Sequence, residues 1–131
     1  MNVLALVLAG HFIGDWIVQT DWQAANKVWT GPSSPLTEAG YRLSWKANQQ
    51  HMLGYHLTLM VLVAPVWHSW AALGGLGISW VTHSIIDRRW PVCWLMAHTG
   101  SKPFSETTFG VIAVDQALHL SILCLLVAVA G

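Results

Sequence analysis

The chain has 131 residues, of which 54% are hydrophobic and only 9% are charged, and its formal net charge is zero. This composition argues against a soluble domain, in which about a quarter of the residues are charged, and the lack of excess positive charge argues against nucleic-acid binding. The two cysteines lie far apart in the sequence and predict neither a disulfide framework nor a cysteine zinc site.

Four apolar segments, each about as long as a membrane-spanning helix, follow one another along the chain. Such a helix needs about 20 residues, and the segments cover residues 3–20, 47–66, 71–90 and 108–130. The sequence therefore predicts an all-α protein with a single transmembrane domain over residues 1–131. We expect it to be an integral membrane four-helix bundle with up-down-up-down topology.

The first and third connections are expected to lie at a membrane surface. Residues 21–50 are more polar than the spans, and glycine and proline within residues 31–35 would break a helix there. Residues 36–50 and residues 92–98 are predicted to form short interfacial helices. The charged side chains of the first connection, Lys27 among them, are expected to be interfacial charges without special chemistry. Its tryptophans Trp22, Trp29 and Trp45 are expected to anchor the chain at the inner membrane interface.

The positions of the basic residues predict the orientation of the bundle. All six lysine and arginine residues fall in the first and third connections. Connections rich in these residues usually stay on the cytoplasmic side of a membrane. We therefore expect a multi-pass protein of the plasma (inner) membrane with both termini outside.

Three pairs of histidine and aspartate, spaced four residues apart, interrupt the apolar segments. The pairs are His11 with Asp15, His83 with Asp87 and, in reverse order, Asp115 with His119. Residues four apart share one face of a helix, and the predicted orientation places all three pairs and His51 at one depth near the cytoplasmic face. Ionisable residues inside a membrane usually face the bundle interior and have a function.

Three aspartates at one depth would repel one another, so this polar layer needs counter-charge. Neutral histidine and aspartate are ordinary ligands of zinc, manganese and iron, and carboxylate-rich helix bundles hold two metal ions between facing helices. We therefore predict a site for a divalent transition metal and expect two ions. The seven predicted ligands are His11, Asp15, His51, His83, Asp87, Asp115 and His119.

A site with two metal ions favours hydrolysis, because the ions activate water and polarise the bond under attack. At headgroup depth the substrate would be a membrane lipid or a peptide that reaches the interface. The predicted catalytic residues are Asp15, Asp87, Asp115 and Gln19, and Gln116 can orient a ligand or a water molecule. Two alternatives stay open: a noncatalytic, metal-free polar network that stabilises the bundle or a homo-oligomer, and a small proton or ion pathway.

The motifs resemble those of small bacterial and phage membrane proteins grouped as domain of unknown function 3307. The resemblance covers nearly the whole chain, and its motifs are His11-Phe12-Ile13-Gly14-Asp15 with Gln19, Trp22 and Lys27; His51 with Tyr55; Thr82-His83 with Ile86-Asp87-Arg88; and Asp115-Gln116 with Leu118-His119-Leu120. The resemblance favours His51 over His56 as the ligand from the second span, but it implies no established activity. More distantly, the chain is similar to membrane-bound metal-dependent hydrolases, which implies hydrolysis. A phage origin would add a further alternative, an accessory protein that alters the host membrane by binding.

Overall fold

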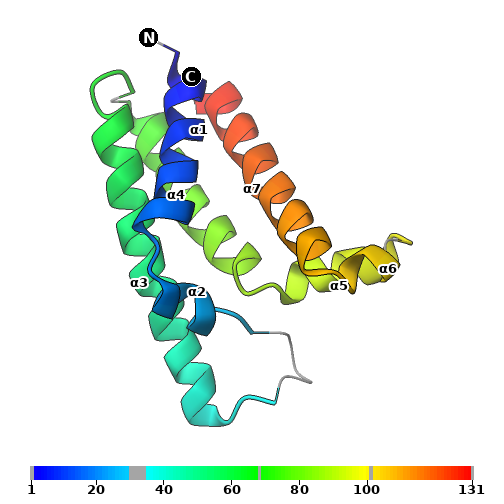
Figure 1. The fold of residues 1–131 in the computed structure, drawn as a ribbon. Helices are drawn as coiled ribbons and strands as arrows, with labels where there is room; N and C mark the ends of the chain where they lie inside the picture. Colours follow the sequence, from blue (N-terminus) through cyan, green and yellow to red (C-terminus); the bar gives the residue numbers. More distant parts are fainter. Residues whose placement is uncertain (1, 30–34, 68, 101, 131) are drawn as a thin grey trace.

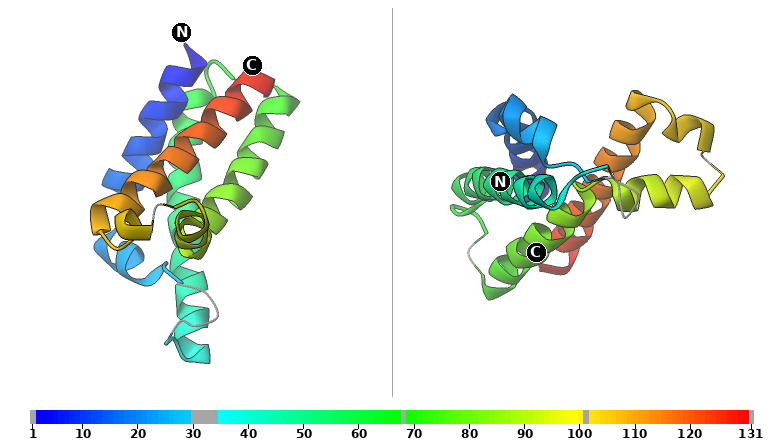
Figure 2. Two further views of the ribbon diagram at one scale, coloured as in Figure 1. Left: turned by 90° about the vertical axis from the view of Figure 1, so that its right-hand side faces the viewer. Right: turned by 90° about the horizontal axis from the view of Figure 1, so that it is seen from below.

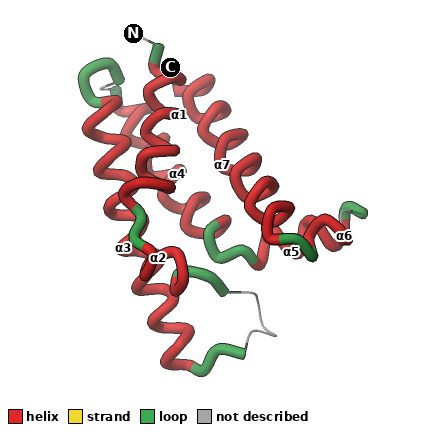
Figure 3. Tube along the Cα trace, viewed as in Figure 1, coloured by secondary structure: helices red, strands yellow, loops and turns green. Residues whose placement is uncertain are grey.

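The computed structural model describes residues 2–29, 35–67, 69–100 and 102–130. Within these residues the regular elements are helices, apart from one isolated bridge between Trp29 and Arg89, so the predicted all-α class is confirmed. Figure 3 shows the helices and their connections. The elements are α1 (Val3–Ile13), the π-helical turn η1 (Gly14–Val18), α2 (Asp21–Asn26), α3 (Glu38–Val63), α4 (Trp70–Ile86), α5 (Trp90–His98), α6 (Lys102–Ser105) and α7 (Thr108–Ala130).

The four long helices α1, α3, α4 and α7 enclose a common interior. Helix α1 packs against α3 and α7, and α4 packs against the same two helices. Both ends of the chain lie at one end of this arrangement (Figure 1). At the other end, α3 extends beyond its neighbours, while α5 and α6 project to one side (Figure 2). The end of the four-helix interior at which both chain termini lie is called the terminal end here. At the opposite end the connections between helices are longer.

The first connection is more helical than we predicted. Residues 21–26 form α2, because Thr20 and Gln23 make a capping box at its first turn. Helix α3 begins at Glu38 and continues without interruption to Val63, so the predicted surface helix and the second span are one helix. The predicted break at residues 31–35 falls largely on residues 30–34, outside the described part of the chain.

The third predicted span ends earlier than residue 90. Helix α4 stops at Ile86, and Arg89 has a left-handed backbone with φ of 62°, which no continuing right-handed helix allows. Helix α5 follows at once, with Pro91 in its first turn. The fourth segment, in contrast, forms a helix over the predicted residues 108–130, and the Thr107 hydroxyl accepts a hydrogen bond from the Gly110 amide at 2.9 Å.

Among the described helices, only α7 is both long and apolar enough to cross a membrane. Helix α4 and the continuous segment formed by α1 and η1 are apolar but shorter, and the first half of α3 is polar. The sequence predicted four spans of full length, whereas the described helices include one clear candidate. The shortfall arises because η1 ends at Val18 and Arg89 closes α4, so the polar ends of both predicted spans lie outside the apolar helices.

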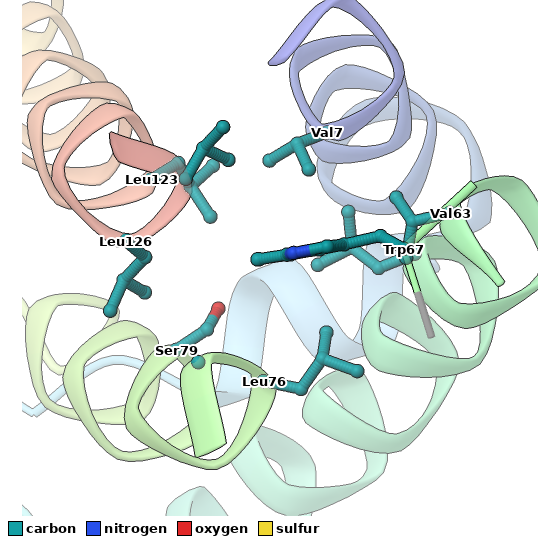
Figure 4. Close-up of a pocket in the computed structure, with 10 residues that line it drawn as sticks. Val7, Val63, Trp67, Leu76, Ser79, Leu123 and Leu126 are labelled. Atoms are coloured by element: carbon teal, nitrogen blue, oxygen red, sulfur yellow. The ribbon is translucent and has the colours of Figure 1, made fainter. Parts of the chain in front are cut away.

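The terminal end of the interior is apolar. Val7, Val63 and Leu123 form a buried cluster there, and Trp67 packs against it while its indole N–H donates to the Ala130 carbonyl at 3.0 Å. Figure 4 shows these side chains pointing into one small space between the helices. The polar residues lie farther along the same interior, toward the opposite end of the bundle.

Candidate metal centre

A close approach of two helices places Asp15 in the bundle interior. A Cβ atom at Gly14 would lie 3.2 Å from the Tyr55 Cα, so only glycine lets the start of η1 approach α3 this closely. Asp15 is the next residue and lies in the π-helical turn, a local departure from α geometry that is frequent at functional sites. The turn directs the Asp15 carboxylate toward α3 and α4.

Four buried side chains from three segments converge next to that turn, and they are Asp15, His51, His83 and Asp87. One ligand atom from each lies within 4.8 Å of every other. His51 Nε2 is 2.9 Å from Asp15 Oδ1 and 3.3 Å from Asp87 Oδ2, and His83 Nε2 is 3.2 and 3.5 Å from the same two oxygens. Two imidazole nitrogens and two carboxylate oxygens thus surround one small space, as expected of a metal centre.

Lys27 is a member of this site, and the prediction that it is an interfacial charge without special chemistry is wrong. Its side chain is buried, and Nζ lies 2.8 Å from Asp87 Oδ2 and 3.9 Å from Asp15 Oδ1. Lys27 follows the last residue of α2, so the unpredicted α2 is the element that carries it inward. The sequence held one signal for this, because Lys27 belongs to the motif that carries the family resemblance.

His119 lies at the edge of the four-residue cluster with one ring nitrogen free of hydrogen bonds. Its Nδ1 is 3.0 Å from the Asp115 carbonyl oxygen, which only accepts, so Nδ1 carries the proton. In the neutral imidazole, Nε2 is then a bare lone pair. It is buried without a hydrogen-bond partner among the described residues and lies 4.0 Å from Asp87 Oδ1.

His11 was predicted to be a ligand, but it is not one of the four converging side chains, although its ring lies beside those of His83 and His119. The Asp15 carboxylate accepts from the Gln116 amide at 3.0 Å, which leaves the Gln116 oxygen to accept from His11 Nε2, also at 3.0 Å. His11 Nδ1 then accepts from the Tyr55 hydroxyl at 3.0 Å. Both ring nitrogens of His11 are occupied, so His11 supports the Asp15 carboxylate through Gln116. Gln116 joins His11 to Asp15, and its role in orienting a metal ligand stays a prediction.

The other two predicted residues lie at the border of the site. Asp115 is not one of the four converging side chains, and its Oδ2 is 3.4 Å from the Gln116 amide nitrogen and 3.6 Å from His119 Nδ1. Gln19 lines the cleft described below, and its buried Oε1 has no hydrogen-bond partner among the described residues. Neither residue contacts the two imidazoles that complete the cluster.

A buried arginine fixes the backbone around Lys27 and Asp87. Arg88 is only 1% exposed, and its guanidinium carbon lies 4.5 to 5.5 Å from the ring centres of Trp29, Tyr41 and Trp45. It also donates to the Ser44 hydroxyl at 2.9 Å. The sequence predicted these tryptophans as membrane anchors, yet two of them contribute to a cation–π cage that ties α3 to the end of α4.

One polar cleft, with a volume of about 340 Å³, opens beside the cluster. Asp15 and Asp87 lie in its wall together with Lys27 and Arg89, and its rim includes the exposed Trp16. The cleft therefore borders the two buried carboxylates on one side. The lining residues are Asp15, Trp16, Gln19, Thr20, Asp21, Ala24, Lys27, Asp87, Arg89, Ile112, Asp115 and Gln116.

Comparison with known proteins identifies a family to which the chain is similar. The family model described as "Protein of unknown function (DUF3307)" matches residues 3–130, which confirms the predicted family resemblance. No curated protein and no solved structure matches the chain. The comparisons lend no support to the expected similarity to membrane-bound hydrolases or to a phage origin.

Proposed function

The chain belongs to the DUF3307 family, and we propose that it is a membrane-embedded, metal-dependent hydrolase. The observation that carries the proposal is the convergence of Asp15, His51, His83 and Asp87 within 4.8 Å in a buried site. Two buried carboxylates this close are costly unless a cation compensates them. Neutral histidine and carboxylate together form a ligand set typical of a divalent transition metal such as zinc, manganese or iron.

The spacing of the four side chains supports a metal ion as that cation. Ligand atoms at about 2.0 to 2.2 Å from a tetrahedral zinc ion lie about 3.3 to 3.6 Å from one another. The four measured separations between imidazole nitrogen and carboxylate oxygen run from 2.9 to 3.5 Å. Asp87 Oδ2, although 2.8 Å from Lys27 Nζ, lacks a hydrogen bond of acceptable geometry. These residues therefore fit a metal ion with little rearrangement.

A second ion is supported by His119. When the His119 imidazole is neutral, as a metal ligand must be, Nε2 and Asp87 Oδ1 are both acceptors, and they face each other in a buried region at 4.0 Å. Two acceptors in that position repel unless a cation lies near them. Asp87 and His119 would then hold the second ion, and Asp87 would also contribute to the first, as carboxylates do in two-metal centres. His11 and Asp115, which were predicted as ligands, would support this pair indirectly.

The chain's own residues suit hydrolysis at such a centre. Bound divalent ions supply Lewis acidity and a nucleophile at neutral pH. Gln116 holds Asp15 by Oδ2, which leaves Oδ1 directed at the histidines. Lys27 holds Asp87 in place, and the adjacent cleft admits water and one end of a substrate. Among the predicted catalytic residues, Asp15 and Asp87 are the ones at the centre, whereas Gln19 and Asp115 line the route to it.

The exposed surface supports location in the plasma (inner) membrane. In α7, only 17% of the most apolar window is covered by the rest of the chain. Large apolar side chains such as Val61, Phe109 and Val129 are each at least 74% exposed. We propose that α7 spans the bilayer and that α1, α3 and α4 cross it with it, with both termini outside and the metal centre near the cytoplasmic face.

A noncatalytic function is the second candidate, because a metal-free polar seam already joins α3 to α4. Asn48 and Gln49 hydrogen-bond to Ser84, Gln49 accepts from Trp80, and His56 contacts Ser79. In that case the Lys27–Asp87 ion pair would be the permanent state of the site. The polar layer would then stabilise helix pairing, or a homo-oligomer, without turnover.

The test is the metal content of the protein purified in detergent without chelators. We expect about two equivalents of a transition metal by mass spectrometry, retained in His98→Gln, whose exposed imidazole bonds to the Trp94 carbonyl and stacks on the Trp94 ring. Protein that is folded but holds no stoichiometric metal would reject the hydrolase and favour the polar seam. Asp87→Asn alone removes the nearest carboxylate of Lys27 and can destabilise the fold for that reason. The double variant Lys27→Met with Asp87→Asn removes both charges, so its folding is compared with that of the single variant.

A further inference from the structure

Arg89 is a positively charged residue in the wall of the cleft. The Arg89 side chain is half-buried and lines the cleft together with Lys27 and Asp87. Among the residues that the structure describes, no carboxylate lies within ion-pair distance of its guanidinium, whereas Lys27 and Arg42 each have such a partner. An unpaired guanidinium facing a polar cleft is suited to bind an anion from outside the chain.

The backbone at this position gives a second, independent reason to look for a function. Arg89 is the only non-glycine residue with positive φ among the described residues, at 62°. Glycine takes this conformation without steric cost, while other residues are held there at an energetic cost that is common at functional sites. Arg89 also gives α5 no side-chain cap, so local structure does not explain why an arginine is present.

The charge of the cleft depends on what the centre holds. Without metal, the four aspartates among its lining residues outnumber Lys27 and Arg89, and an anion would be repelled. With two divalent ions the balance becomes positive, and the cleft attracts anions. Arginine binds phosphate oxygens through two parallel N–H donors, a geometry that a single carbonyl oxygen of an ester or peptide cannot match.

We propose that Arg89 binds the phosphoryl group of the substrate, so that the protein hydrolyses a phosphate ester and not an acyl or peptide bond. This inference rests on the proposed metal-dependent hydrolase. Lys27 is the second cation in reach of the same cleft, and Trp16 and Ile112 line it with apolar surface. The phosphoryl group can belong to a lipid headgroup or to a soluble phosphate ester. Only the lipid has acyl chains that can pack against Trp16.

The experiment measures equilibrium binding of inorganic phosphate to zinc-loaded protein in detergent by titration calorimetry. Arg89→Gly relieves the backbone strain and removes the guanidinium. We expect it to keep its metal content and its melting temperature, or to raise the latter, and to bind phosphate at least about tenfold more weakly. Arg42→Gln is the matched control, because it also removes one positive charge but from an exposed pair with Glu38. Its phosphate affinity should equal that of the native chain.

Three results would be decisive. Unchanged phosphate affinity in Arg89→Gly that retains its metal would overturn the role of Arg89, and acetate that binds as tightly as phosphate would overturn the substrate class. Native protein without metal would instead overturn the proposed function itself. To identify the source, glycerol 3-phosphate is compared with dihexanoyl phosphatidic acid. If the phosphatidic acid binds more tightly than glycerol 3-phosphate, and Trp16→Ala abolishes that difference, the phosphoryl group belongs to a lipid headgroup. If the two compounds bind with equal affinity, it belongs to a soluble ester. Either result agrees with a phosphoryl site.

Discussion

Two segments of this protein carry the same motif, histidine followed four residues later by aspartate, and they use it differently. In the pair at the end of α4, both His83 and Asp87 face the centre. In the pair of α1 and η1, only Asp15 does, while His11 is bonded to Tyr55 and Gln116. The spacing predicts that both side chains lie on one helix face, but it does not predict whether both reach the same site.

The difference has two physical causes. The π-helical turn starts at Gly14, between the two residues of the first pair, and changes the direction of the Asp15 side chain relative to that of His11. In addition, α7 lies beside α1 and inserts Gln116 between His11 and the carboxylate. The α4 pair has neither feature, and its two side chains remain i,i+4 neighbours with 3.5 Å between His83 Nε2 and Asp87 Oδ2.

Replacing the histidine of the α4 pair should have the largest effect. We expect His83→Ala to lose stoichiometric metal altogether, because it removes one of the four converging ligand atoms. The measurement is zinc content by mass spectrometry after dialysis against metal-free buffer, with circular dichroism as a check on folding. Full retention of metal in folded His83→Ala would show that the four-residue cluster is not the binding site.

Removing Lys27 should affect the metal-free and metal-loaded states in opposite ways. In Lys27→Met, Asp15 and Asp87 lose their buried counter-charge, and the metal-free protein should be destabilised by about 3 to 5 kcal/mol. Added zinc should restore most of that stability and bind more tightly than to the native chain, since no ammonium competes for Asp87.

Thermal unfolding of Lys27→Met with chelator and with zinc is the corresponding measurement. Lys46→Met is its control, because Lys46 is exposed and takes part in no ion pair among the described residues. Equal destabilisation with and without zinc would mean that the lysine has a structural role unrelated to a cation site.

The α7 pair, in which the order of the two residues is reversed, allows a smaller and more selective test. His119→Ala should lower the metal content from about two equivalents to about one, because only the proposed second ion depends on Nε2 of this residue. Metal titration monitored by calorimetry would then show one binding step in place of two. Loss of both ions, with the fold intact, would place His119 at the first site instead.

The sequence predicted more of the site than of its surroundings, and the reason is geometric. Periodicity placed Asp15, His51, His83 and Asp87 on interior faces at one depth, and the distances confirm that these four meet. It could not place Lys27, because the residue is brought inward by α2, a six-residue helix with no apolar periodicity. It could not predict that His11 faces Gln116, because that depends on how α7 packs against α1.

The same limit applies to the helices and to the aromatic residues. Apolar length predicted four spans, but the helix ends are set by local features: Thr37 caps α3, and the backbone at Arg89 closes α4. The tryptophans of the first connection were interpreted through composition alone. Their contacts with Arg88 join residues far apart in the sequence, and no local pattern specifies them.

Replacing His11 should have the smallest effect on metal binding, and it distinguishes the two motifs most clearly. In His11→Phe, the Gln116 amide oxygen loses its hydrogen-bond partner and Gln116 holds Asp15 less firmly, while all four converging side chains remain. Losses of this kind weaken metal binding by about 10- to 100-fold without abolishing it.

His56→Phe is the matched control. His56 is also buried and bonded through both ring nitrogens, but its partners, the Met52 carbonyl and the Ser79 hydroxyl, are not bonded to the side chain of any of the four converging residues. Zinc affinity measured by competition with a chelating dye should fall in the first variant and stay unchanged in the second. If His11→Phe removed the metal as completely as His83→Ala does, both members of the first motif would be ligands after all, and the π-helical turn would have to straighten when the ion binds.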